Sequence, residues 1–279
     1  MTPVKILDKT VRLLSVFCAA HPEWSLTELS ATVSMPKSTV HRILRVLRQH
    51  DYLSQDAGTG RFRLGFAALD LGFRAQAGLD VRRAAAPVLQ RLAATSGETV
   101  LLIMPTETRT AAICVDRAET RAGLQLILEI GRHVPLHAGA SSKVLLAYMT
   151  EREIEQVIVR GLERVGPRTI TNPLALRRDL AAIRRRGYAW SVEETNEDVA
   201  GIAVPLLDRN GSIAAGVSIV GPRTRFTPQR VPALLALIRD GAAEIARQSG
   251  LTTLPDTAAN GRVAVKRRAP RAGAHTSGR

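Results

Sequence analysis

The amino-acid sequence predicts an α+β protein in which a small N-terminal winged helix-turn-helix module precedes a larger α/β domain. Three observations carry this prediction. The chain has 279 residues, a length typical of about two domains. Within residues 1–64, two short amphipathic helices separated by a tight turn are followed by a glycine-rich hairpin signal. From residue 79 to residue 250, strand patterns alternate with helix patterns, and no internal repeat is present.

The composition restricts the class of protein. The net charge is +14, which favours a phosphate-rich partner without proving one. The two cysteines, Cys18 and Cys114, are too few for a disulfide scaffold and have no zinc-ligand spacing. No apolar run approaches the roughly 18 residues of a membrane span, and the N-terminus lacks the apolar core of a signal peptide. We therefore expect a soluble cytoplasmic protein with no cofactor, no metal and no membrane contact.

The first two predicted helices cover residues 5–19 and 25–33. The first has apolar residues at approximately helical spacing and ends before Pro22, because proline disfavours helical backbone in the residue that precedes it. The second begins with a capping box. The Ser25 side chain accepts a hydrogen bond from the backbone amide of Glu28, and the Glu28 side chain accepts one from the backbone amide of Ser25. This reciprocal capping is a strong signal for a helix start.

A third helix is predicted from Pro36 to about His50. Proline suits the first turn of a helix, where its missing N–H would have no partner. Apolar side chains recur at i, i+3, i+4 and i+7, which places one stripe against a core: Val40, Ile43, Leu44 and Leu47. A charged helix face is usually only solvated surface, but this segment contains no acidic residue at all. The basic face therefore favours a nucleic-acid-binding helix.

A hairpin signal follows the third helix. Residues 52–54 and 61–64 are predicted strands, and the turn between them contains two glycines. Two helices with a tight turn and such a wing form a winged helix, whose second helix enters the major groove of double-stranded DNA. The expected DNA contacts come from the helices and from the cationic face of the wing: Ser25, Thr27, Lys37, Ser38, Thr39, His41, Arg42, Arg45, Arg61 and Arg63.

The second domain shows antiparallel hairpins with helices between them, a pattern typical of an α+β domain. Predicted strands cover residues 99–105, 110–115, 199–207 and 212–220. Predicted helices begin near Ala140, at Asn172-Pro173 and at Thr227-Pro228, and the last one ends at Gly250. After residue 250 the apolar periodicity stops, so residues 251–279 are predicted to form a basic disordered tail.

The predicted helix near Ala140 carries a candidate anion site. Small residues surround its start, from His137 to Ser142. The first amides of a helix have no partner within it, and the helix N-terminus carries a partial positive charge, so a carboxylate can bind there. The alternative is that Ser141 or Ser142 merely caps the helix, which is the more common role of serine at this position.

Several blocks of this sequence resemble the IclR family of bacterial transcriptional regulators. They lie within residues 4–250 and include KILDKTVRLLSVF, SLTELSATVSMPKSTVHRILRVL, DYLSQDAGTGRFRLG, GRHVPLHAGASSKVLLA and IAVPLLDRNGSIAAGVSIVGPRTRFTP. The resemblance implies a winged helix-turn-helix domain in residues 1–64, a linker helix in 65–78 and a GAF-like effector-binding domain in 79–250, before the tail of residues 251–279. It implies a ligand-responsive repressor or activator of a catabolic operon.

The resemblance also implies a small organic acid as effector. The family's pocket positions correspond here to Val134, Ala140, Ser141, Ser191, Val199, Gly201 and Ala203, and the helix-start segment adds His137 and Ser142 as candidate effector-binding residues. This sequence departs from the family's pattern at three places. Ser191 replaces a frequent aspartate, Ala200-Gly201 replaces a common Arg-Cys pair, and Ser142 replaces a frequent glycine. These replacements predict a roomier and less polar pocket, which favours a bulkier acid of aromatic or hydroxylated type.

The expected assembly follows from the DNA-binding module. One recognition helix reads too few base pairs for specificity in a genome, so a homodimer on a palindromic operator is expected. The resemblance adds a dimer of dimers through the effector domains. RNA polymerase is a further expected partner, and the expected location is the cytoplasm, in association with the nucleoid.

Two other classes of protein compete with this interpretation. The first is an enzyme that acts on a small acid and has an accessory DNA-binding domain, but the sequence contains no nucleophile elbow, paired-histidine metal motif or phosphate loop. Its candidate catalytic residues would be Cys114, Asp116, His137, Glu193 and Glu194. The second is an RNA-binding or architectural protein driven by the tail, for which the 4% aromatic content provides no stacking platform.

Overall fold

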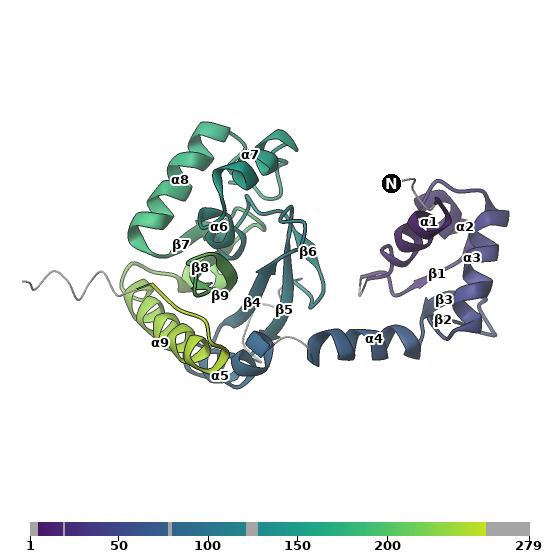
Figure 1. The fold of residues 1–279 in the computed structure, drawn as a ribbon, viewed down its shortest axis with the longest axis horizontal. Coiled ribbons are helices and arrows are strands. Elements are labelled where there is room, and N and C mark those ends of the chain that lie inside the picture. The colour runs from purple at the N-terminus through teal and green to yellow at the C-terminus, as the bar shows by residue number, and fades with distance from the viewer. Residues whose placement is uncertain (1–4, 19, 78–79, 121–127, 255–279) are drawn as a thin grey trace, which may run out of the picture.

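The computed structural model describes residues 5–18, 20–77, 80–120 and 128–254 (Figure 1). The N-terminal module contains three helices and a small antiparallel sheet of strand order β1-β3-β2. The helices are α1 (Lys5–Leu14), α2 (Leu26–Thr32) and α3 (Lys37–Gln49). The strands are β1 (Glu23–Trp24), β2 (Leu53–Gln55) and β3 (Phe62–Leu64).

The predicted winged helix-turn-helix is confirmed, with one helix shorter than expected. Helix α1 ends at Leu14, although the buried side chain of Phe17 still reaches the module's core. The capping box at α2 is present, since the Glu28 amide donates to Ser25 Oγ (3.3 Å) and the Ser25 amide donates to Glu28 Oε2 (2.8 Å). The predicted stripe of α3 is buried against Leu13, Leu29 and Phe62.

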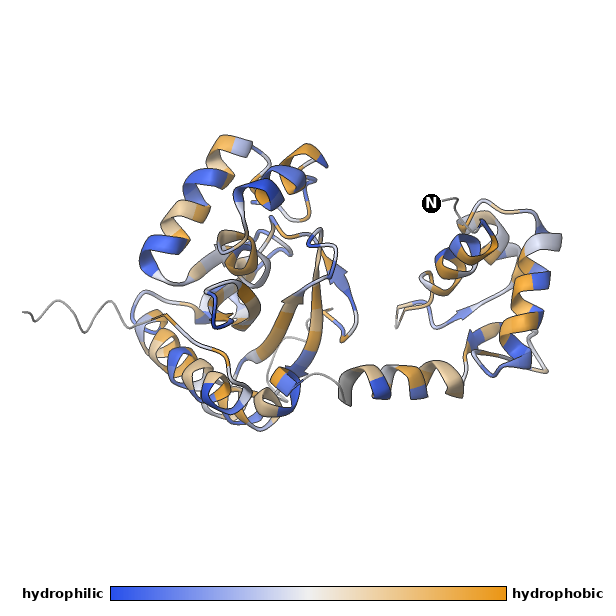
Figure 2. Cartoon of the chain, viewed as in Figure 1, coloured by the Kyte–Doolittle hydropathy of each residue, from blue (hydrophilic) through white to orange (hydrophobic). Residues whose placement is uncertain are grey.

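The wing follows α3 directly. Its turn is held by Asp56, whose Oδ1 accepts hydrogen bonds from the amides of Gly58 (3.1 Å) and Thr59 (2.7 Å). Gly60 closes the turn at a φ of 69°, a conformation that costs glycine little. Helix α4 (Phe66–Ala77) then occupies the predicted linker and exposes large apolar side chains, which appear as orange segments in Figure 2.

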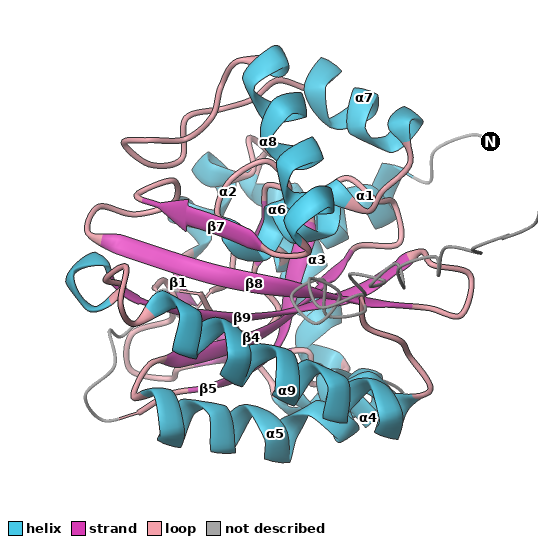
Figure 3. Ribbon diagram, turned by 90° about the vertical axis from the view of Figure 1, so that its left-hand side faces the viewer, coloured by secondary structure: helices cyan, strands magenta, loops and turns pink. Residues whose placement is uncertain are grey.

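The C-terminal domain is built on one antiparallel sheet of strand order β6-β5-β4-β9-β8-β7. The strands are β4 (Thr99–Pro105), β5 (Ala112–Ala118), β6 (His133–Val134), β7 (Ala189–Val192), β8 (Val199–Leu207) and β9 (Ile213–Pro222). The helices are α5 (Asp80–Ser96), α6 (Ala140–Ala147), α7 (Glu151–Val159), α8 (Pro173–Arg186) and α9 (Val231–Ser249), with a short turn of 3₁₀ helix at Arg223–Arg225. Figure 3 shows α5 and α9 on one face of the sheet and α6, α7 and α8 on the other.

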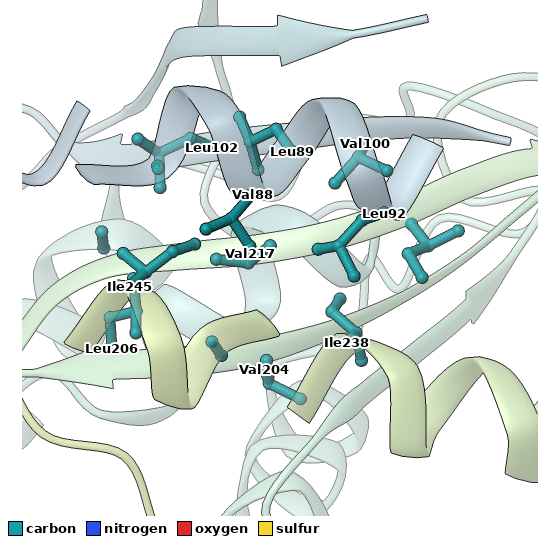
Figure 4. Packing of buried hydrophobic residues seen from close by; sticks show 14 of the residues in the cluster. Val88, Leu89, Leu92, Val100, Leu102, Val204, Leu206, Val217, Ile238 and Ile245 are labelled. Carbon is teal, nitrogen blue, oxygen red and sulfur yellow. The ribbon is translucent and has the colours of Figure 1, made fainter. Parts of the chain in front are cut away.

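Each face of the sheet has its own hydrophobic core. On one side, Val88 and Leu92 of α5 and Ile238 of α9 pack against the strand residues Val204 and Val217 (Figure 4). On the other side, helix α6 is almost wholly buried between the sheet and α8. Alternate residues along β8 and β9 point to opposite cores, and so both strands are apolar apart from Ser218 of β9.

Helix α6 lies close to the sheet because small residues form the surface beneath it. A Cβ atom added at Gly216 would lie 2.9 Å from Val144 Cγ1, and one added at Gly201 would lie 3.6 Å from Ala140 Cβ. Ala203, which is fully buried, occupies the same face of β8. The helix N-terminus is thus held at the sheet, next to the ends of β7 and β8.

The predicted tail begins later than expected. The backbone of Thr252 exchanges two hydrogen bonds with Leu207 at the end of β8, at 2.8 and 2.9 Å, so residues 251–254 belong to the folded domain. The sequence of this segment shows no strand periodicity, and this is why the prediction was wrong there. The rest of the predicted tail, residues 255–279, lies outside the described residues.

Candidate functional sites

The solvent-facing side of α3 is a free basic surface. Lys37, His41, Arg42 and Arg45 are exposed, and within the described part of the chain none of them forms an ion pair. Ser38 is also exposed, whereas Thr39 is half-buried. These side chains share one face because the opposite stripe fills the core. The structure therefore brings the predicted contacts of this helix together.

The two wing arginines differ in their surroundings. Arg61 is engaged within the module, since its Nη2 lies 2.8 Å from Glu28 Oε2 and ties the wing to α2. Arg63 donates to Ser54 Oγ at 3.1 Å, lies at a looser 3.9 Å from Glu23 Oε1 and remains largely exposed. Of the two predicted contacts on α2, Ser25 is occupied as the helix cap, and Thr27 is exposed. Arg63 and Thr27 are therefore the freer side chains.

A cavity of about 270 Å³ opens at the N-terminus of α6. Its lining is mainly apolar, from β4, β8, β9 and the segment around β6. The lining residues are Leu101, Ile103, Leu128, Arg132, Val134, Pro135, Ala138, Gly139, Ala140, Ser141, Ser142, Val165, Ser191, Thr195, Asn196, Val199, Ala200, Gly201 and Val220. A volume near 300 Å³ with a few convergent polar groups is typical of a small-molecule site.

The polar groups of the cavity gather at the start of α6. Gly139, at a φ of 82°, donates its amide to Glu194 Oε2 (3.1 Å), and the Ala140 amide donates to Ser191 Oγ (2.8 Å). Among the described residues, the amides of Ser141 and Ser142 have no partner. Two free amides at a helix N-terminus form a seat for an anion.

The alternative role of the serines as helix caps is not observed. The N-cap residue is Gly139, and no side chain caps the helix. Ser141 instead donates its hydroxyl to Ser218 Oγ at 2.7 Å, inside the domain. Ser218 is fully buried on β9, and the sequence interpretation missed it. The sequence did offer a signal for Ser218, because a single serine at an inward-facing position of an otherwise apolar strand indicates a polar contact inside the domain.

Comparison with known proteins assigns the chain to a family. A model of the IclR helix-turn-helix domain matches residues 6–57, and a model described as bacterial transcriptional regulator IclR C-terminal matches residues 73–247. The chain belongs to the IclR family. The HTH-type transcriptional regulator KipR of Bacillus subtilis is 35% identical over 249 residues, which cover 89% of this chain and 98% of KipR. KdgR of Escherichia coli is 34% identical, covering 84% of this chain and 88% of KdgR.

A solved structure of an IclR homologue resembles the whole fold. This homologue, from Microbacterium hydrocarbonoxydans, is complexed with 4-hydroxybenzoate. It superimposes with a TM-score of 0.78 at 26% identity, covering 88% of this chain and 99% of the homologue. IclR membership establishes that the chain is a DNA-binding transcriptional regulator of mixed α+β fold with a C-terminal effector-binding domain. None of its described helices is long and apolar enough to span a membrane.

The IclR assignment also decides against the enzyme, since the relatives are named as regulators. The candidate catalytic residues are engaged separately. Burial raises the pKa of the Cys114 thiol to about 12, so it is not a nucleophile near neutral pH. Glu193 pairs with Arg168 at 3.0 Å, and the His137 ring contacts the Glu163 carbonyl at 2.8 Å. Within the described residues, no cluster of three or more His, Cys, Asp or Glu side chains could hold a metal.

Seven of the nine expected effector-binding residues line the cavity, and two do not. His137 is buried toward Glu163, and Ala203 lies beneath α6. The sequence interpretation missed the lining from β4, Leu101 and Ile103, and the polar pair Thr195 and Asn196. These residues come from segments distant in sequence, and only the sheet order brings them to α6.

A buried charge network lies beside the cavity of this IclR protein. Lys143 of α6 is 1% exposed, and its Nζ lies 2.6 Å from both Glu194 Oε1 and Asp179 Oδ2. Burial raises the pKa of the Glu194 carboxyl, and the Lys143 ammonium opposes that shift. Glu194 also accepts a hydrogen bond from the Gly139 amide. The network therefore ties the start of α6 to the chain segment at Glu194.

Proposed function

We propose that this regulator senses a small monocarboxylic acid of aromatic type in the cavity at α6 and controls a catabolic operon in response. The observation that carries the proposal is the pairing of free amides at Ser141 and Ser142 with apolar walls. A carboxylate suits the amides, and an aromatic ring suits the walls. Arg132 is the one ionisable side chain in the described lining, and the Glu194 carboxyl behind Gly139 is paired with Lys143. The homologue complexed with 4-hydroxybenzoate supports the same class of ligand.

On the DNA side, we propose that α3 enters the major groove of a palindromic operator. Arg42, Arg45 and Lys37 are free to meet base edges and phosphates. Arg61 then acts by holding the wing, while Arg63 faces the DNA backbone.

We further propose a homodimer, or a dimer of dimers, that pairs through α4. Phe66 is 83% exposed and Phe73 is 62% exposed, which is unusual for a monomer surface. Leu69 and Leu71 are exposed on the same helix. Sedimentation of the full-length chain checks this proposal, and a monomer at micromolar concentration would contradict it.

A thermal-shift panel tests the effector class. We expect benzoate and 4-hydroxybenzoate to raise the Tm of the full-length chain more than pyruvate or glyoxylate at equal concentration. A ligand at 100 times its Kd stabilises the protein by about 2.7 kcal/mol. An unchanged Tm with every acid of the panel would remove the proposed effector class.

Ser141→Trp should abolish the response to the acid and keep DNA binding. The indole fills the cavity and displaces the hydroxyl that bonds Ser218, while α3 lies in a separate module. We expect the thermal shift with 4-hydroxybenzoate to disappear and the operator affinity to change less than about 3-fold. Gln156→Trp, at an exposed site on α7 that does not line the cavity, is the matched control for adding an indole. A Ser141→Trp variant with a normal thermal shift would place the acid elsewhere.

A further inference from the structure

The cavity wall formed by residues 128–134 is bonded to the outer edge of β5. The Gly131 amide donates to the Cys114 carbonyl (2.7 Å), and the Cys114 amide donates to the Arg132 carbonyl (3.2 Å). Farther along the strand, Arg117 Nη1 donates to the Leu128 carbonyl (3.0 Å). Leu128 and Arg132 both line the cavity. A shift of this wall on ligand binding therefore acts directly on β5.

Strand β5 has a bulge at the point that faces α5. Leu102 pairs with Asp116 and Ile103 pairs with Cys114, so Val115 between them has no partner on β4. A bulge leaves one residue outside the ladder and redirects its polar groups. Here the freed Val115 carbonyl accepts a hydrogen bond from Arg82 Nε at 3.2 Å.

Arg82 lies in the first turn of α5, which follows the linker helix α4 in the chain. Its Nε is also 3.5 Å from Asp116 Oδ2. That carboxylate oxygen is buried without a hydrogen bond, and in the described residues Arg82 is its one ion-pair partner. A nearly buried carboxylate with a single counter-charge strongly favours one position of that charge. Arg82 thus fixes the start of α5 to the bulge.

We propose that Arg82 is the positioning residue that couples the cavity to the DNA-binding module. The wall at 128–134, the bulged strand and the start of α5 form a continuous set of bonds. A ligand that moves the wall moves Val115 and Asp116, and through Arg82 it moves the helix start next to the linker. The inference rests on the proposed function, because it requires an acid that binds the cavity.

The test separates coupling from binding with the full-length chain. A DNA duplex that the protein binds is first selected from random DNA. The Kd of the protein for this duplex is then measured with and without acid. The acid is 4-hydroxybenzoate, unless another acid of the panel raises the Tm more. In the wild type we expect the acid to change the duplex Kd by about 5- to 150-fold. In Arg82→Met, which keeps the methylene packing and loses the donors, we expect a change below 2-fold. The Kd for the duplex without acid and the Kd for the acid without duplex should each remain within about 3-fold of the wild-type value.

Arg83→Ala is the matched control. Arg83 lies in the same turn, its side chain is 75% exposed, and within the described part of the chain it pairs with Asp80 alone, so its loss should leave the response normal. Linkage gives a second readout that a merely structural role would not move. In Arg82→Met, saturation with the duplex should no longer change the affinity for the acid. If Arg82→Met does not fold, Asp116→Asn is measured in the same assay. This variant removes the counter-charge of Arg82, and the acid should then change the duplex Kd by less than 2-fold.

Three results would overturn the inference. Arg82→Met could respond to the acid as the wild type does, Arg83→Ala could lose the response equally, or a bound acid could leave the wild-type duplex affinity unchanged. The proposed function survives the first two results, because the acid still binds and still acts. If no acid of the panel binds the wild type, the proposed function fails, and the inference fails with it.

Discussion

Lys143→Met is expected to lower the free energy of unfolding of the C-terminal domain by about 3–5 kcal/mol. Removing one partner of a buried ion pair leaves the other charge uncompensated, and this cost greatly exceeds that of an exposed pair. Here the loss strands Glu194, which is 7% exposed, next to the partly buried Asp179. Chemical denaturation of the full-length chain, followed by circular dichroism and tryptophan fluorescence, measures the change.

The pH dependence of this loss identifies its cause. Burial already raises the pKa of Glu194, and removal of the ammonium raises it further. A carboxyl with a higher pKa in the folded state takes up a proton on folding, so stability falls as the pH rises above the ordinary glutamate pKa of about 4.3. The Lys143→Met deficit should therefore be larger at pH 8 than at pH 5.

Two variants complete that experiment. Lys143→Met combined with Glu194→Gln should recover part of the stability, because the uncompensated carboxylate is gone. Lys5→Met removes an exposed lysine of α1 and should change the free energy of unfolding by less than about 0.5 kcal/mol. A Lys143→Met loss below 1 kcal/mol, or a loss that does not depend on pH, would contradict a stabilising role for this network.

Local chemistry made the N-terminal module predictable. The capping box, the apolar stripe of α3 and the glycine-rich turn each act over a few residues, and each is present in the structure. The early end of α1 at Leu14 was not predictable, because the buried Phe17 continues the apolar pattern after the helix has ended. Helix α7 carries its own capping box at Thr150 and Glu153, a signal that the sequence interpretation overlooked.

The cavity was predictable only in part. The start of α6 and its small residues indicated one wall, and Ala140 and Ser141 line the cavity in the structure. The opposite walls depend on which strands are neighbours, and β4 reaches the site because it pairs with β9 in the centre of the sheet. The ion pairs of Lys143 and Arg82 join residues 34 to 51 positions apart. No local pattern reveals such pairs.

Arg42→Ala is expected to cause a loss of operator binding that other surface arginines do not share. A side chain that makes a good bidentate contact to a base contributes about 1–3 kcal/mol of discrimination, and a dimer loses that contact in both half-sites. Arg42 is exposed on α3 and has no ion-pair partner among the described residues. We expect the Kd for the selected duplex to rise at least 30-fold, as measured by fluorescence anisotropy at fixed salt.

The controls for Arg42→Ala distinguish base reading from charge. Arg178→Ala removes the same charge from the exposed face of α8 and should leave the duplex Kd within 2-fold. Arg61→Ala should weaken binding less than Arg42→Ala, because Arg61 is held by Glu28 and acts through the position of the wing. A phosphate contact would lower affinity for all duplexes alike and reduce the salt dependence, whereas a base contact changes which duplexes are preferred. Because the proposed acid site lies in the other domain, Arg42→Ala should keep the full thermal shift with 4-hydroxybenzoate. Equal operator affinity in mutant and wild type would exclude Arg42 from the reading surface.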